Sequence, residues 1–265
     1  MKVAVTDEER SLSYYRFYER EMAEVPEKLW QRTLEDAEKP EELLPFVRRS
    51  DFVRGSDEAF CQSGFGCFED GTAAVCSRLY MPGVSPQMLD WWFPWHSVGS
   101  DLRYKIWDPE DHYFATAYPA SKVLDSNVPT AQKTWGVDHY IMEDVGFGPQ
   151  FVQIRFVRPA DAGCDEQLIG SDNCAGLVCG IGINTGTTMI HKWYPYQDGV
   201  IFQSRFWIGW GYLPDGSLGK CLPDEAAIPE AFARAMFAHS LKEYINLASF
   251  LPELYQEEKG KENSL

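Results

Sequence analysis

Alternation of apolar and polar residues with a period of two recurs through the middle of this chain and constrains its fold more than any other feature. In the segment FVQIRFVR, Val152, Ile154 and Phe156 fall on one face of an extended chain. Gln153 and Arg155 fall on the opposite face. This period is typical of half-buried antiparallel strands.

Related patterns occur in further segments, which Gly, Pro, Asn and Asp turns separate from one another. About seven strands in succession, with no helix between them, predict an antiparallel sheet. Besides 151–158, the expected strands are 73–80, 112–119, 135–143, 175–183, 187–194 and 200–208.

Helical patterns lie on both sides of the strand-rich region. After Pro223, residues 226–255 carry one apolar side over a long helical stretch, and we expect Pro252 to end its regular part. A shorter helix is expected to begin where Ser85 precedes Pro86.

The N-terminal region, from Thr6 to about residue 49, is also expected to be helical. Thr6 and Glu9 form a capping-box pattern, T-x-x-E. Pro26 and Pro40 should divide the region into two or three helices.

These patterns together predict an α+β fold in which a curved antiparallel sheet grips a long C-terminal helix. Such an arrangement leaves a ligand cavity between sheet and helix. We expect an N-terminal helical extension over 1–50, a catalytic domain over 51–256 and a flexible tail over 257–265.

Net charge limits the partners that the chain can have. Lys and Arg number 24 and Asp and Glu number 40, giving a net charge of −16. Such a surface repels phosphate backbones and anionic membranes, so we expect neither nucleic acid nor membrane as a partner. The N-terminus does not read as a secretory signal and no apolar run is long enough to span a bilayer. The sequence therefore predicts a soluble, cytoplasmic protein.

The cysteines and aromatic residues add two further expectations. Seven cysteines, an odd number without any C-x-x-C pair, indicate reduced thiols, and none of them stands out as catalytic. Phe, Trp and Tyr make up 14 % of the chain, which fits a large aromatic core with some rings lining a pocket for a flat ligand.

Histidine and glutamate spacing points to a metal site. His239 and Glu243 are four residues apart in the C-terminal helical stretch, so both side chains lie on one helix face and can share a metal. His139 and Glu143 have the same spacing within an expected strand, where residues four apart also share a face. His112 opens another expected strand. The spacing thus leaves three histidines and two glutamates for about four ligand positions.

Two common catalytic motifs are absent from the sequence. No G-x-G-x-x-G segment occurs, which disfavours a dinucleotide site. No G-x-S-x-G segment occurs either, which disfavours an α/β-hydrolase.

From the WWFPWH segment to the C-terminal helical stretch, the chain resembles the diacetylphloroglucinol hydrolase family, which includes phloretin hydrolase. The resemblance implies a Bet v 1-like, helix-grip fold and a zinc ion bound by two histidines and two glutamates. One implied ligand pair is His239 and Glu243, and the other is His112 and Glu143. The resemblance therefore favours His112 over His139 as a ligand.

The resemblance also implies roles for residues around the zinc. Tyr104 matches a pocket tyrosine and His191 matches a pocket histidine of the family. Ala115 stands where the family member that acts on diacetylphloroglucinol has an asparagine, so we expect the substrate to be held differently here. The expected substrate is phloretin or a similar acylphloroglucinol with a bulky acyl arm.

The implied reaction is hydrolysis of a carbon–carbon bond in a ketonic substance. Zinc would provide hydroxide at neutral pH to attack the acyl carbonyl, after the phenolic ring has tautomerised to a keto form. His191 would move a proton to or from the ring, because imidazole titrates near neutral pH, and Tyr104 would hold a ring hydroxyl.

Two other functions fit the same residues. Two histidines with carboxylates also suit a non-haem iron oxygenase. A helix-grip protein can instead bind an aromatic hydrophobic ligand without catalysis. We further expect the chain to form a homodimer.

Overall fold

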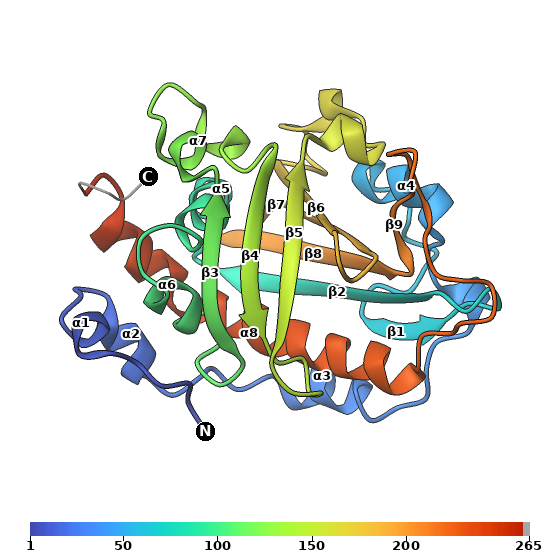
Figure 1. The fold of residues 1–265 in the computed structure, drawn as a ribbon, viewed down its shortest axis with the longest axis horizontal. Coiled ribbons are helices and arrows are strands. Elements are labelled where there is room, and N and C mark those ends of the chain that lie inside the picture. Colours follow the sequence, from blue (N-terminus) through green and yellow to red (C-terminus); the bar gives the residue numbers. More distant parts are fainter. Residues whose placement is uncertain (262–265) are drawn as a thin grey trace.

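The computed structural model describes residues 1–261 and contains an eight-stranded antiparallel sheet that wraps around one long helix (Figure 1). The strands follow the order β1-β2-β8-β7-β6-β5-β4-β3. Strands β3 to β8 are therefore sequential neighbours, and the β1–β2 hairpin joins the sheet beside β8. The strands are β1 (Gly64–Cys67), β2 (Ala73–Pro82), β3 (His112–Tyr118), β4 (Val137–Glu143), β5 (Gln150–Val157), β6 (Gly176–Gly182), β7 (Thr187–Tyr196) and β8 (Gly199–Ile208).

Each of the seven strands predicted from the sequence is present, within two residues at either end. Strand β1 escaped prediction because two of its four residues, Gly64 and Gly66, are glycines that give no apolar alternation. A small second sheet pairs β9 (Trp210–Tyr212) with β10 (Leu218–Lys220). The prediction of an α+β fold with an antiparallel sheet is confirmed. The expectation that no helix lies between the strands is wrong, since short helices separate β2 from β3 and β3 from β4.

Helix α8 (Glu230–Glu258) has 29 residues and is about 43 Å long at 1.5 Å per residue. It packs against β1 and β2, while β3, β4 and β5 run across the direction of β2 because the sheet is strongly curved (Figure 1). Phe237, Leu241 and Leu247 on this helix are fully buried. Their burial joins the helix to the sheet and confirms the helix-grip arrangement.

The expectation that Pro252 ends the regular part of this helix is wrong. The helix continues through Pro252 to Glu258. Leu254 is fully buried beyond the proline, and Ser13 donates a hydrogen bond to the Glu258 carboxylate at 2.8 Å. These contacts offset the loss of one backbone hydrogen bond at the proline. Of the tail predicted for 257–265, residues 262–265 lie outside the described part of the chain.

The N-terminal region consists of short helical segments rather than the two or three helices expected. The predicted capping box is present, since Thr6 Oγ1 accepts from the Glu9 backbone at 3.1 Å and Glu9 accepts from the Thr6 backbone at 2.7 Å. Arg16 pairs with Glu253 of α8 at 2.7 Å, so this region packs along the C-terminal helix. The segments are α1 (Asp7–Arg10), α2 (Tyr15–Glu19), α3 (Glu27–Arg32), η1 (Pro40–Glu42), η2 (Phe46–Arg48) and α4 (Arg49–Arg54).

Between β2 and β3 the chain forms two helices that cover one end of the space between sheet and helix. Helix α5 (Pro86–Trp95) begins at the predicted proline and buries Trp92 and Trp95 completely. Helix α6 (Leu102–Lys105) has only four residues and was not predicted. The remaining short segments are α7 (Ala120–Leu124), η3 (Thr130–Gln132), η4 (Pro159–Ala162) and η5 (Glu166–Leu168).

All seven cysteines are free thiols, as their number and spacing predicted. Within residues 1–261, no helix combines the length and the apolar character needed to cross a membrane.

Candidate metal centre and active site

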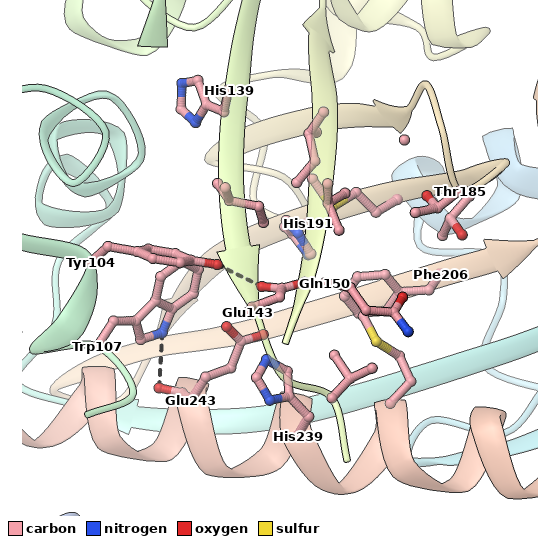
Figure 2. Close-up of a pocket in the computed structure, with 18 of the residues that line it drawn as sticks. Tyr104, Trp107, His139, Glu143, Gln150, Thr185, His191, Phe206, His239 and Glu243 are labelled. Carbon is pink, nitrogen blue, oxygen red and sulfur yellow. Dashed lines mark hydrogen bonds between the residues drawn. The ribbon is translucent and has the colours of Figure 1, made fainter. Parts of the chain in front are cut away.

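A cavity lies between the sheet and α8, lined by residues of both (Figure 2). Its volume of about 110 Å³ is several times the roughly 15 Å³ that one water molecule needs. The apolar residues that line it include Val152, Ile154 and Phe156, which the period-two pattern placed on one strand face, and Phe206 and Ile208 of β8.

Four side chains predicted as metal ligands meet beside one end of this cavity, which three of them line and the fully buried His112 does not. His112 begins β3 and Glu143 ends β4, and the antiparallel register pairs these two residues directly. His239 and Glu243 project from successive turns of α8. Figure 2 shows Glu143 of β4 facing His239 and Glu243 of α8. The fold therefore brings together two pairs that are about a hundred residues apart in the chain.

The distances between the four side chains are short. His112 Nε2 lies 3.4 Å from His239 Nε2, 3.7 Å from Glu243 Oε2 and 3.8 Å from Glu143 Oε2. Ligand atoms of His112, Glu143 and His239 all lie within 4.8 Å of one another. One ion of the size of Zn²⁺ can therefore contact all three, and Glu243 is close enough to complete the set.

A hydrogen bond orients the imidazole of His112, and a carboxylate lies behind that of His239. His112 Nδ1 lies 3.3 Å from the Tyr104 carbonyl oxygen, to which it donates, so its Nε2 lone pair points into the site. His239 Nδ1 lies 3.6 Å from Asp111 Oδ2. Asp111 in turn accepts a hydrogen bond from Lys242 at 2.5 Å. A carboxylate behind a histidine is the usual second partner of a metal-binding imidazole.

The electrostatics of the site favour a bound cation. Burial raises the pKa of Glu243 well above its usual value, and burial lowers that of His112 well below. Burial also opposes protonation of His239, but Asp111, Glu243 and Glu143 outweigh it and raise the pKa of His239 to about 9. Two buried carboxylates beside two facing imidazole nitrogens form the N/O donor set that zinc binds. The residues present thus fit a divalent metal ion.

A second cluster of acidic residues beside the site is less suited to a metal ion. Atoms of Asp108, Asp111 and His239 also lie within 4.8 Å of one another. However, the Lys242 ammonium lies 2.5 Å from Asp111 and 3.6 Å from Asp108. This ammonium already supplies the positive charge at that position.

His139, the histidine that spacing alone could not exclude, lies away from the four. It lines the cavity on the same face of β4 as Glu143, as expected for residues four apart. At about 3.3 Å per residue it is about 13 Å further along the strand. Its Nε2 atom lies 3.1 Å from Ser97 Oγ instead.

Tyr104 lines the cavity as predicted and contacts two of the candidate ligands. Its hydroxyl donates to Glu143 Oε2 at 2.5 Å, and its ring stacks on His112 with centroids 3.9 Å apart. Burial raises the pKa of Tyr104 well above its usual value. The tyrosine is therefore a neutral donor that holds Glu143.

His191 also lines the cavity and is 2 % exposed. Its Nδ1 atom lies 2.7 Å from Ser204 Oγ, and its Nε2 atom lies 3.3 Å from Tyr244 Oη. Burial lowers the pKa of His191 to about 3, so the imidazole is neutral at pH 7. This differs from the expectation that His191 titrates near neutral pH. The sequence indicated neither polar partner: Tyr244 directly follows Glu243 within the apolar stripe, and Ser204 sits opposite His191 in the β7–β8 register.

Ala115 is buried opposite Ile141 in the β3–β4 register and is 5 % exposed. It packs in the main core, and the residues that line the cavity do not include it. Its methyl group offers no hydrogen bond at this position.

The sheet, the helix and the cavity define a helix-grip protein, and the clustered histidines and glutamates place it among those with a candidate metal-dependent active site. The particular family follows from comparison with known sequences. Residues 44–256 match the model described as the DAPG hydrolase PhiG domain, and the chain belongs to this family.

Two relatives differ in how closely they match. A phloretin hydrolase from Eubacterium ramulus is 55 % identical over 260 residues, which cover 98 % of this chain and 95 % of that protein. A 2,4-diacetylphloroglucinol hydrolase from Pseudomonas protegens is 29 % identical over 229 residues, covering 81 % of this chain and 74 % of that protein. Among solved structures, that of Ara h 8.0201 has a TM-score of 0.41 and 10 % identity, covering 69 % of this chain and 99 % of that one. The fold assignment rests on the sheet and helix themselves.

Proposed function

We propose that this protein is a zinc-dependent hydrolase that cleaves the carbon–carbon bond between an acyl group and a phloroglucinol ring. The observation that carries the proposal is the convergence of His112, Glu143, His239 and Glu243 at one end of an aromatic cavity. The names of the two relatives, a phloretin hydrolase and a diacetylphloroglucinol hydrolase, support this substrate class.

Zinc held by these four residues would act as a Lewis acid and would make water nucleophilic at neutral pH. The reaction adds the oxygen of water to the acyl carbon, and the bond from that carbon to the ring breaks. The ring carbon receives a proton, so the products are a carboxylic acid and a phloroglucinol.

The protein side chains position the reactants. Tyr104 donates to Glu143 Oε2, the oxygen that lies 3.8 Å from His112 Nε2, and so holds this carboxylate in place at the site. His191 is neutral at pH 7, and its two ring nitrogens face Ser204 Oγ and Tyr244 Oη, so it serves as a hydrogen-bonding group of the cavity wall and not as an acid. The surrounding apolar side chains exclude water from the flat ring.

Phloretin is the preferred substrate in this proposal. The support for phloretin is the identity to the phloretin hydrolase, 55 %, which is much higher than the 29 % identity to the diacetylphloroglucinol hydrolase. Ala115 adds nothing to this preference, because it does not line the cavity.

The test combines metal content with turnover. Protein purified without added metal should contain about one zinc per chain and should release phloroglucinol from phloretin, and a chelator should stop the release. His239→Ala and Glu243→Ala should lose the zinc. Glu253→Ala, which removes an exposed carboxylate from the same helix, should keep it.

Two outcomes would redirect the assignment. Turnover that requires oxygen would indicate a non-haem iron oxygenase. Binding of phloretin without any product, and without need for the four residues, would indicate a ligand-binding protein.

A further inference from the structure

Two histidines line the cavity beyond the candidate metal centre. His96 and His139 are 3 % and 1 % exposed, and their ring centroids lie 5.4 Å apart. The Tyr104 ring lies between them and the centre, 3.9 Å from His112 and 5.8 Å from His96. Figure 2 shows His139 at the opposite end of the β4 segment from Glu143.

Hydrogen bonds around Ser97 fix the tautomer of His139. Ser97 Oγ lies 3.2 Å from the Pro94 carbonyl oxygen and 3.1 Å from His139 Nε2, but it has one proton to donate. Within residues 1–261, that hydroxyl is the one donor to the Pro94 oxygen, so donation there satisfies a buried carbonyl. Ser97 then accepts from His139 Nε2–H. The remaining nitrogen, Nδ1, is a buried acceptor with no partner in the described structure.

His96 also presents an acceptor nitrogen. Its Nδ1 atom lies 3.1 Å from the Trp92 carbonyl oxygen, which can only accept, so Nδ1 carries the proton. Burial lowers the pKa of His96 to about 4 and that of His139 well below its usual value. Both rings are therefore neutral at pH 7, and His96 Nε2 is also an acceptor.

Tyr104 and Trp107, the two residues with donor groups that line the cavity beside these histidines, direct those groups elsewhere. Tyr104 donates to Glu143, and Trp107 Nε1 donates to the Glu243 carbonyl oxygen at 3.0 Å. The wall thus offers acceptors without a matching donor. A carboxylate or phenolate would bring its negative charge against these lone pairs, whereas a neutral hydroxyl supplies the missing proton.

We propose that His96 and His139 form a subsite for a neutral phenolic hydroxyl at the far end of the substrate from the bond that is cleaved. This inference rests on the proposed function, which places the reacting carbonyl at the metal centre. At about 3.3 Å per residue, His139 is about 13 Å along β4 from Glu143. The subsite therefore contacts the end of the acyl arm that lies away from the reacting carbonyl. Phe156, with its ring 4.4 Å from that of His139, supplies an apolar surface for an aromatic ring.

The test compares phloretin with its analogue that lacks the hydroxyl on the ring of the acyl arm. Wild-type protein should prefer phloretin by about 10- to 100-fold in kcat/KM, because the analogue leaves a buried acceptor unpaired. His139→Phe keeps an aromatic ring but removes the acceptor, and it should abolish most of this preference. Phe151→Leu removes an aromatic ring from the same sheet at a half-exposed position outside the cavity, and it should retain the preference.

The same two compounds are also titrated into chelator-treated protein by tryptophan fluorescence, which measures binding without turnover. Equal affinity of wild type for both compounds, or a preference that survives in His139→Phe, would overturn the subsite. If His139→Phe does not fold, the wild-type binding preference decides. Failure of the proposed function has a different signature: metal-loaded wild type would cleave neither compound, whatever their affinities.

Discussion

Replacing Tyr104 with phenylalanine tests how the chain holds Glu143. The change removes one hydroxyl, which donates to Glu143 Oε2 at 2.5 Å, and keeps the ring that stacks on His112 at 3.9 Å. Tyr104 is 2 % exposed, so solvent has little room to replace the lost donor. We therefore expect a weaker metal site in a protein that still folds.

The size of the effect follows from the type of hydrogen bond. A bond to a charged acceptor contributes about 1.5–3 kcal/mol, and each 1.4 kcal/mol corresponds to about tenfold in affinity. Loss of such partners typically weakens metal binding about 10- to 100-fold. We expect a loss near the lower end, about tenfold, because the same bond exists in the metal-free protein and Glu143 loosens in both states.

The assay is competition for zinc between the protein and a chromophoric chelator. Tyr18→Phe is the matched control, because its hydroxyl donates to the Val3 carbonyl oxygen away from the site and its loss should leave zinc affinity unchanged. Unchanged zinc affinity in Tyr104→Phe would refute the reasoning. A fall in kcat/KM alone would then show that Tyr104 acts on the substrate.

Three further predictions concern metal orientation, pH and packing. Asp111→Asn should weaken zinc binding about 10- to 100-fold in the same competition assay, because Asp111 orients His239; unchanged affinity would remove that role. The pKa of His191 is about 3 when folded and about 6.5 when unfolded, so the folded state binds fewer protons and loses stability as pH falls below 6.5. Between pH 7 and pH 5, the free energy of unfolding in urea should therefore fall by about 2 kcal/mol less in His191→Gln than in wild type, and equal falls would contradict the assignment. Gly199→Ala should destabilise the fold by about 2 kcal/mol in urea unfolding, because the added methyl would lie 2.1 Å from the Met81 carbonyl oxygen; wild-type stability would show that the β2–β8 ladder adjusts.

Local patterns predicted the strands and one ligand pair because both depend on spacing within a single element. Alternation at Val152, Ile154 and Phe156 reflects the cavity face of β5, and spacing of four at His239 and Glu243 reflects one face of α8. Each of these features is set by the geometry of its own strand or helix.

The second ligand pair depends on contacts between elements, which spacing alone does not contain. From spacing alone, His112 and His139 were equally compatible with a site at Glu143, and it was the family resemblance that favoured His112. The β3–β4 register gives the physical reason, because it places His112 directly opposite Glu143. Tyr104 and its bond to Glu143 lie on a four-residue helix that is too short to give a periodic signal.

At Pro252, too, contacts between distant elements decide the structure, here by continuing a helix that the local rule ends. A proline in a helix costs about 3 kcal/mol locally, so a local rule ends the helix there. Burial of Leu254 and the bond between Ser13 and Glu258 come from distant parts of the chain and keep the helix intact.

A crystal of the protein purified without added metal, measured on both sides of the zinc absorption edge, would test the metal centre most directly. We predict one anomalous peak about 2.0–2.2 Å from the Nε2 atoms of His112 and His239 and from oxygens of Glu143 and Glu243. A peak between Asp108 and Asp111, or no peak within the cavity of a fully folded protein, would contradict it.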